Sequence, residues 1–95
     1  MIFDGELAVF KSSPSFYELE RDGLKRNTVR LLETHMLQAL LDRWHANPQM
    51  RIRIQALGVS EDFERFITDI SDITHVLALI TPPGKRLVVI SWGRA

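Results

Sequence analysis

The spacing of apolar residues predicts two helices. Over residues 34–46, apolar side chains recur at positions that share one side of a helix, while polar residues fall on the other side. These apolar residues are Met36, Leu37, Leu40, Leu41 and Trp44. A shorter helix is expected to begin at Pro14, because two serines precede a proline there. It is expected to end at Gly23, because glycine adopts the left-handed conformation that follows a last helical turn without strain.

Alternation of apolar and polar residues predicts strands. Residues 50–57 alternate most regularly and predict a strand with one face in the core and one face in water. The side chains expected to face the core are Ile52, Ile54 and Ala56. Residues 27–32 predict a second strand, in which alternate side chains share a face. On one of its faces are Thr28, Arg30 and Leu32.

Four further segments also predict strands. They are residues 6–11, 63–70, 75–81 and 86–92. In the strand over residues 63–70, alternation places Phe66, Thr68 and Ile70 on one side. The last two segments are apolar on both faces, which is typical of central strands. Residues 82–85, Pro-Pro-Gly-Lys, are expected to join them as a hairpin loop.

The predicted order of elements is β-α-β-α-β-β-β-β over one domain of 95 residues. A run of strands after two helices predicts an α+β fold. We expect a small, mainly antiparallel sheet, or a partly open β-barrel, covered by the two helices.

Composition narrows the class of protein only a little. The chain is 45% hydrophobic and has 12 basic and 12 acidic residues, and zero net charge argues against a general polyanion binder. It has no cysteine, which excludes disulfides and thiolate metal sites and fits the cytoplasmic location that we expect. No segment resembles a signal peptide or approaches the roughly 18 apolar residues of a membrane span, so no membrane association is expected.

Common catalytic and cofactor motifs are missing from the sequence. The three histidines, His35, His45 and His75, lack the helical spacing typical of paired metal ligands, so no metal site is expected. No serine lies in a GxSxG turn, and the five glycines form neither a Walker loop nor a GxGxxG motif. We therefore expect no cofactor.

The segment from Gly23 to Arg30, Gly-Leu-Lys-Arg-Asn-Thr-Val-Arg, is the feature that suggests chemistry. Lys25 and Arg26 lie in the loop after the predicted helix, and Thr28 and Arg30 point to the same side of the next strand. These side chains could converge on a small anionic or polar ligand, since they offer a mobile charge, a planar fork of donors and a hydroxyl. The alternative is a solvated basic loop that binds nothing.

The same segment resembles the signature of ASCH domains, G-x-K-x-x-E-x-R. Gly23, Lys25 and Arg30 occupy signature positions, and Thr28 stands where the acid is usual. ASCH domains belong to the PUA-like superfamily of small β-barrels. The resemblance spans residues 7–92 and implies a PUA-like barrel, partly open in this short chain.

The resemblance implies a function connected with RNA. ASCH domains are generally proposed to bind RNA in a cleft beside the signature, so single-stranded RNA or a modified nucleoside is the expected partner. The residues expected to bind it are Lys25, Arg26, Thr28, Arg30 and Tyr17. One ring of the pair Phe16-Tyr17 is expected in the core, and the other could stack on a base.

Thr28 also implies an enzyme as an alternative. A subgroup with threonine at the acid position looks like amidohydrolases that remove the acetyl group from N4-acetylcytidine. In that scheme Lys25 polarises or deprotonates and Thr28 is the nucleophile. A carboxylate partner is also expected, and its candidates by position are Glu61, Asp62 and Glu64.

A protein-interaction module of phage or mobile-element origin, built on a PUA-like scaffold, is another alternative. Small size and zero net charge favour it. It predicts an exposed apolar patch. We expect that patch on the helix over residues 34–46, because this helix intervenes where the family usually has a Gly-Asp turn.

Overall fold

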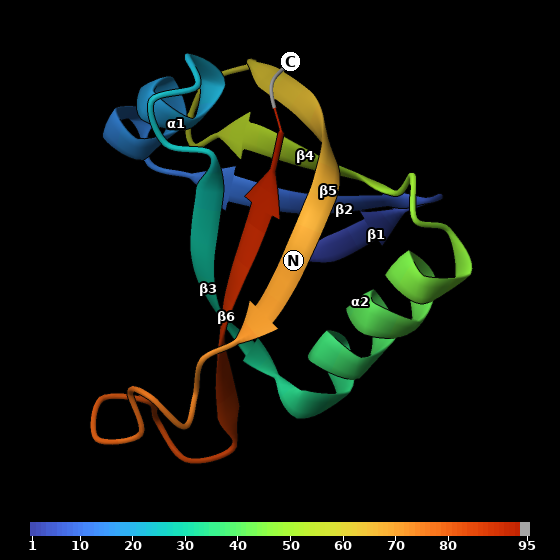
Figure 1. The fold of residues 1–95 in the computed structure, drawn as a ribbon. Helices are drawn as coiled ribbons and strands as arrows, with labels where there is room; N and C mark the ends of the chain where they lie inside the picture. The colour runs from blue at the N-terminus through green and yellow to red at the C-terminus, as the bar shows by residue number, and fades with distance from the viewer. Residues whose placement is uncertain (94–95) are drawn as a thin grey trace.

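The computed structural model describes residues 1–93, which form six strands and two helices (Figure 1). The strands are β1 (Ile2–Asp4), β2 (Leu7–Ser12), β3 (Asn27–Glu33), β4 (Arg51–Ala56), β5 (Asp62–Asp72) and β6 (Lys85–Trp92). The helices are α1 (Pro14–Arg21) and α2 (Thr34–Ala46). The bounds of α2 are those predicted, and α1 is followed by Gly23 with a φ of +80°, the left-handed conformation expected there.

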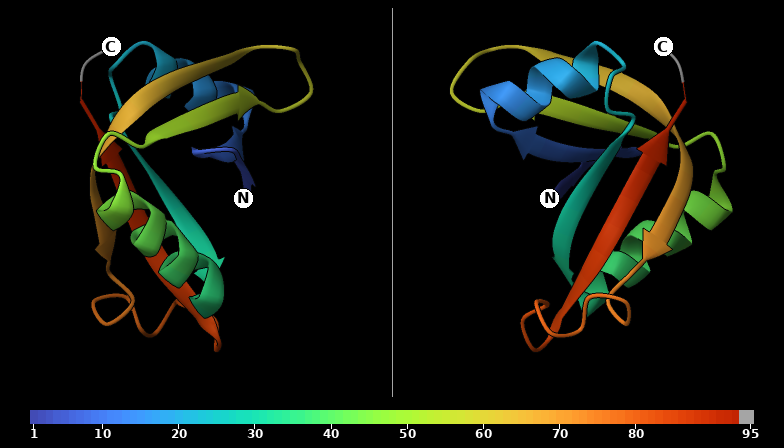
Figure 2. Two further views of the ribbon diagram at one scale, coloured as in Figure 1. Left: turned by 90° about the vertical axis from the view of Figure 1, so that its right-hand side faces the viewer. Right: turned by 60° about the vertical axis from the view of Figure 1, so that its left-hand side comes forward.

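The six strands form one sheet that bends strongly and stays open. Its order is β1-β2-β4-β5-β6-β3, and only the β2–β4 pair is parallel. The strand β5 makes the bend, because residues 62–66 pair with β4 and residues 67–72 pair with β6. As a result β2 and β4 run across the direction of β3 and β6 (Figures 1 and 2). The predicted α+β fold with a mainly antiparallel, open sheet and two helices is confirmed.

The core fills the inside of the bent sheet, and α2 packs against it. The inward alternation predicted for β4 is confirmed, since Ile52, Ile54 and Ala56 are all buried. The predicted stripe of α2 also faces inward: Leu37 and Leu40 are buried. The other three members of that stripe, Met36, Leu41 and Trp44, are partly buried against the same cluster.

The predicted faces of β5 are wrong in part. The buried side chains are Phe63, Ile67 and Ile70, whereas Phe66 is 57% exposed. Strict alternation fails because the register shifts between Ile67 and Asp69, where the strand leaves one neighbour and joins another. A bulge of this kind adds a residue to one strand and re-aims the side chains that follow.

The strand predicted over residues 75–81 is also wrong. This segment forms turns in a loop over residues 73–84, so the predicted hairpin loop is only the end of a longer connection. A strand here would have to pair with β6, but β6 already pairs with β5 on one side and β3 on the other. The short strand β1 was not predicted.

No helix among the described residues is long and apolar enough to span a membrane.

Candidate functional site

A pocket of about 330 Å³ lies where the end of β2, the helix α1 and the first half of β3 meet. Its lining residues are Lys11, Ser12, Ser13, Phe16, Glu20, Lys25, Thr28, Val29 and Arg30. We call it the Thr28 pocket. Four of its residues, Lys25, Thr28, Val29 and Arg30, come from the segment that the sequence singled out.

The deepest charged group of the Thr28 pocket is the carboxylate of Glu20, which is 1% exposed. Lys25 Nζ donates to Glu20 Oε2 at 3.1 Å and to the carbonyl oxygen of Asn27 at 2.6 Å. Gly23 allows this contact, because its left-handed turn reverses the chain and brings Lys25 back beside the last turn of α1. A carboxylate this buried requires such a partner, since unpaired burial of a charge is costly.

Ser12, the last residue of β2, connects the carboxylate of Glu20 to Arg30. Its hydroxyl donates to Glu20 Oε1 at 2.7 Å and accepts from Arg30 Nη2 at 2.7 Å. Glu20 therefore receives a hydrogen bond on each carboxylate oxygen. The result is a continuous polar network that runs from Lys25 through Glu20 and Ser12 to Arg30.

Arg30 joins two strands that no backbone ladder connects. The two strands are β2 and β3. Among the described residues β3 pairs only with β6, and the pairing of β2 with β1 stops at Val9, so the end of β2 has no strand partner on the side of β1. The Arg30 side chain spans this gap, because Nη1 donates to the carbonyl oxygen of Lys11 at 2.7 Å. Its Nε donates to Thr28 Oγ1 at 2.8 Å, which fixes the hydroxyl of the buried Thr28.

Burial lowers the pKa of the Arg30 guanidinium from its usual value, and the negative charge of Glu20 acts in the opposite direction. An arginine remains charged under such a shift because the guanidinium is a very strong base. Lys11, Lys25 and Arg30 thus bring three cationic groups to the Thr28 pocket against the single carboxylate of Glu20. The pocket therefore favours an anionic or strongly polar ligand.

One aromatic ring lies at the mouth of the Thr28 pocket. Phe16 is 54% exposed, and Lys25 Nζ lies 5.6 Å from the centre of its ring. Its neighbour Tyr17 is 3% exposed and packs against Phe63, with 5.4 Å between the ring centres. The prediction that one ring of this pair belongs to the core is therefore confirmed for Tyr17. The expected binding role of Tyr17 is not supported, and Phe16 holds the position from which a ring could stack.

The structure brings together three of the four polar residues expected at the site. Arg26 does not line the Thr28 pocket but a separate one on the other side of the α1–β3 turn. Lys25 and Arg26 are consecutive residues of this turn, but they line different pockets.

The carboxylates proposed from sequence position all lie elsewhere. Glu64 pairs with Arg53 at 2.9 Å, Glu61 lies 3.6 Å from Arg21, and Asp62 lines a different pocket. The acid that meets Lys25 is Glu20, which sequence reasoning missed. Its signal was present in α1, because Glu20 lies three residues after Tyr17 and so shares the helix face that enters the core.

Two other residues of the pocket were also missed. Ser12 and Lys11 come from β2, and only the packing of β2 beside β3 brings them to the site. No group of three or more histidine, aspartate and glutamate side chains that could hold a metal ion occurs within residues 1–93.

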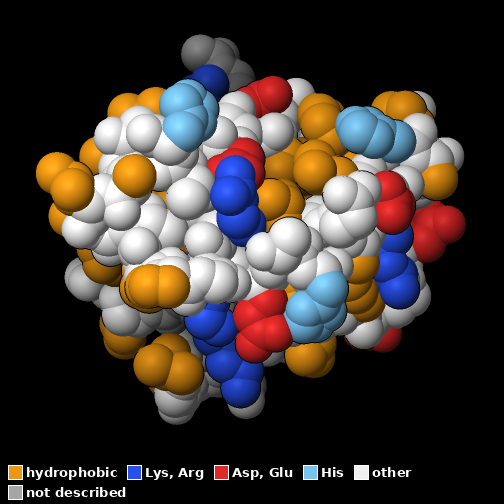
Figure 3. All heavy atoms as spheres, turned by 90° about the horizontal axis from the view of Figure 1, so that it is seen from below, with side chains coloured by type: hydrophobic (Ala, Val, Ile, Leu, Met, Phe, Trp, Pro, Cys, Tyr) orange, Lys and Arg blue, Asp and Glu red, His pale blue; other side chains and the backbone are white. Residues whose placement is uncertain are grey.

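Exposed apolar side chains gather on the loop over residues 73–84 and not on α2, where an interaction patch was expected. Leu79 is fully exposed, and Val76 and Ile80 are 67% and 71% exposed. The apolar stripe of α2 is covered by the core instead. On the underside of the molecule, hydrophobic side chains form several separate groups (Figure 3).

Comparisons of the chain with family models, curated proteins and solved structures give no match. The chemistry of the Thr28 pocket is therefore argued from its own residues.

Proposed function

We propose that the protein is an RNA- or nucleotide-binding module of ASCH type and that the Thr28 pocket receives a nucleotide of a single strand. The observation that carries this proposal is the meeting of Lys25, Thr28 and Arg30 in one cationic pocket with an exposed phenylalanine at its mouth. Lys25 and Arg30 occupy positions of the signature, and Thr28 stands where its acid is usual. Lys25 lies in the turn after α1, and Thr28 and Arg30 lie on β3.

The chemistry of the pocket suits a nucleotide. Phe16 offers a face for a base, and stacking of a base on an aromatic ring contributes about 1–3 kcal/mol. Lys11 and Lys25 supply ammonium groups that attract phosphate. A volume of about 330 Å³ is at the small end of ligand pockets, which favours one base or nucleotide over a duplex groove.

A titration of isotope-labelled protein with a short, mixed-sequence single-stranded RNA tests the proposal. Backbone amide resonances are followed by NMR at low and at moderate salt. We expect saturable shifts centred on residues 11–16 and 25–30, with an apparent affinity that falls steeply as salt rises, because phosphate contacts release counterions. Shifts confined to the loop over residues 73–84, or no shifts at either salt, would contradict it.

A second candidate is the amidohydrolase that removes acetyl from N4-acetylcytidine, and one observation favours it. Lys25 donates a hydrogen bond to the buried carboxylate of Glu20, and the pocket that both residues line also contains Thr28. In this reaction Glu20 takes a proton from Lys25, and the resulting amine takes the proton of Thr28 as its oxygen attacks the acetyl carbonyl. The carbon–nitrogen bond then breaks, cytidine leaves with the proton from Lys25, and water releases acetate from Thr28.

Release of acetate from N4-acetylcytidine at high enzyme concentration separates the two candidates. The enzyme candidate requires turnover that is lost in Thr28→Ala and partly retained in Thr28→Ser, since serine keeps the nucleophilic oxygen. RNA binding without turnover leaves the module as the function.

A further inference from the structure

A second basic pocket lies on the far side of the turn that carries Lys25. It occupies about 240 Å³ between the end of α1, the middle of β5 and the end of β6. Its lining residues are Arg21, Asp22, Gly23, Arg26, Arg65, Trp92 and Gly93. We call it the Arg26 pocket, and it shares no lining residue with the Thr28 pocket.

Among residues 1–93, two of the three arginines in the Arg26 pocket have no acidic partner. Arg21 is paired, because its Nε donates to Asp22 at 2.9 Å. Within the described part of the chain, Arg65 donates only to carbonyl oxygens, those of Glu64 at 2.8 Å and Arg21 at 3.1 Å. The side chain of Arg26 is exposed and makes no hydrogen bond or ion pair with any described residue. The pocket therefore presents a net positive charge with a free fork of donors.

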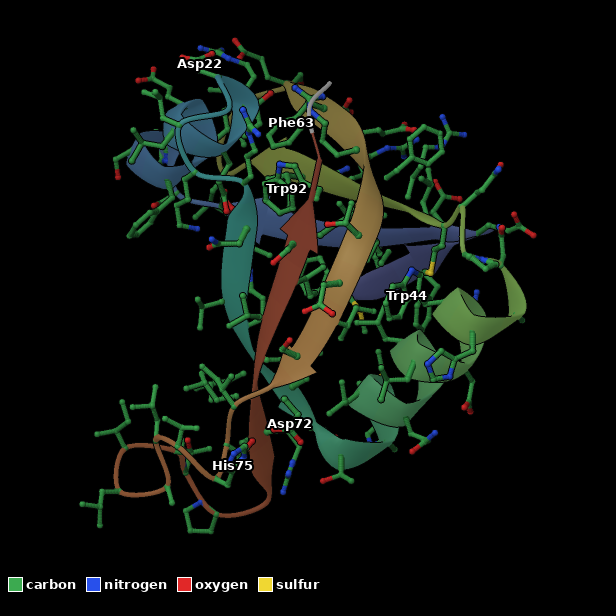
Figure 4. All side chains as sticks on the ribbon, in the orientation of Figure 1. Asp22, Trp44, Phe63, Asp72, His75 and Trp92 are labelled. Atoms are coloured by element: carbon green, nitrogen blue, oxygen red, sulfur yellow. The ribbon has the colours of Figure 1, made fainter. Side chains whose placement is uncertain are left out.

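Trp92 lines the same pocket and carries a buried donor. The Trp92 side chain is 3% exposed, and its indole N–H has no hydrogen-bond partner among residues 1–93. The ring lies inside the fold next to Phe63, with 6.1 Å between the ring centres (Figure 4). The backbone N–H of Trp92 donates to the carbonyl oxygen of Arg26 at 3.0 Å, so the two residues are held together. An unsatisfied buried donor is unfavourable in a folded protein.

We propose that the Arg26 pocket binds a phosphate group. Arg26 offers paired N–H groups in the planar geometry that matches phosphate oxygens, and Arg65 adds a second positive charge from β5 beside the lining residue Trp92. The site does not depend on a base in the Thr28 pocket. The phosphate is either a phosphodiester of a nucleic acid strand or a free phosphate, and these two sources present the same oxygens to the arginines.

The indole of Trp92 can report binding to the Arg26 pocket, and the indole of Trp44 is a control. It has two tryptophans, and the indole N–H of Trp44 is also buried without a partner among the described residues, but Trp44 does not line the Arg26 pocket. Labelled protein gives one indole N–H resonance for each, and Trp92→Phe assigns them. The ligands are inorganic phosphate, the dinucleoside monophosphate UpU and uridine, each against sodium chloride of equal ionic strength.

We expect the Trp92 indole resonance to shift saturably and the Trp44 resonance to stay in place. Arg26→Gln should weaken the apparent affinity by about tenfold, since it removes the free guanidinium. Arg51→Gln, a matched loss of an exposed arginine on β4, should leave it unchanged. A response to UpU and not to inorganic phosphate identifies a strand phosphodiester, and the reverse identifies free phosphate. The proposal is overturned if the Trp92 indole resonance responds to uridine or shows no saturable shift with either phosphate. It is also overturned by equal shifts of both indoles or by equal effects of the two variants.

Failure here is distinguishable from failure of the proposed function. Uridine and RNA are expected to shift residues 11–16 and 28–30 around the Thr28 pocket, whereas the Arg26 pocket reports through the Trp92 indole. The loss of either response leaves the other measurable in the same sample.

Discussion

Lys25 and Glu20 form an ion pair across the end of α1, with Lys25 Nζ 3.1 Å from Glu20 Oε2. The Glu20 side chain is 1% exposed and the Lys25 side chain 27% exposed, so the acid is anchored inside the fold while the base reaches the pocket. The ammonium group of Lys25 donates to Glu20 and to the carbonyl oxygen of Asn27, so its third N–H points in a fixed direction and is available to a ligand. The pair therefore links the stability of the fold to the chemistry of the Thr28 pocket.

Glu20→Gln should lower the free energy of unfolding by about 2 kcal/mol, because it removes the charge that Lys25 and Ser12 were arranged to meet. Urea denaturation measures the change. Glu18→Gln is the matched control, since Glu18 lies on the exposed face of the same helix and should cost less than about 0.5 kcal/mol. Equal losses of unfolding free energy in the two variants would show that the hydrogen bonds of Glu20 do not stabilise the fold.

Two adjacent serines should differ sharply in their contribution to stability. Ser12→Ala leaves Glu20 and Arg30 each one hydrogen bond short and should cost about 1–2 kcal/mol in urea denaturation. Ser13 is the N-cap residue of α1, but its side chain makes no capping hydrogen bond. Ser13→Ala should therefore cost less than about 0.5 kcal/mol, below the usual loss for a capping serine. A larger loss for Ser13→Ala than for Ser12→Ala would contradict the network.

Adjacent aromatic residues should separate binding from stability. Phe16→Ala should weaken RNA binding by about tenfold, through loss of a stacking face, and should leave stability nearly unchanged because the ring is 54% exposed. Tyr17→Ala should cost about 3–5 kcal/mol of stability, since its ring is buried against Phe63. Fluorescence anisotropy with labelled RNA and urea denaturation measure the two effects. If Phe16→Ala binds RNA like the wild type, the ring plays no part in recognition.

Asp72, where β5 ends, should make stability depend on pH on the acid side. Burial raises the pKa of Asp72, but hydrogen bonds from Thr74 and Arg86 outweigh it and hold the pKa below its usual value. The unfolded chain therefore binds the proton more readily than the folded chain. The stabilisation is complete above the ordinary pKa of about 4 and is lost as pH falls through the lower, folded value.

Asp72→Asn should remove this acid-side dependence and cost about 1 kcal/mol at neutral pH, a modest figure because the pair is partly solvated. Urea denaturation between about pH 5 and pH 3 compares the slopes of the wild type and the variant. An unchanged slope would mean that the pKa of Asp72 is the same in the folded and unfolded chains.

The spacing of apolar and polar residues along the sequence was sufficient to predict most of the helices and strands. The helix α2 follows from the spacing of Leu37 and Leu40, and β4 follows from alternation, because in both elements one face meets the core along the whole length. The shared face of Thr28 and Arg30 follows from the two-residue period of β3 in the same way.

The features that the sequence did not predict depend on which elements become neighbours in the folded protein. The run over residues 75–81 has the composition of a strand, but no edge of β6 is free to receive it. The faces of β5 could not be predicted, because its bulge arises from a change of partner. The role of Glu20 also depends on Ser12, which approaches it only when α1 packs beside the end of β2.

The most direct test of the central claim, that the Thr28 pocket binds RNA, uses Lys11. Its exposed side chain lines the pocket without a hydrogen bond to any described residue, so Lys11→Gln should leave the fold intact. Equilibrium binding of a labelled single-stranded RNA is measured at several salt concentrations for the wild type, Lys11→Gln and the control Lys85→Gln, which lies at the far end of β6. We predict an affinity about fivefold weaker at low salt for Lys11→Gln alone, with a salt dependence reduced by about 0.7 in logarithmic slope. Equal affinities and slopes for all three proteins would contradict the claim.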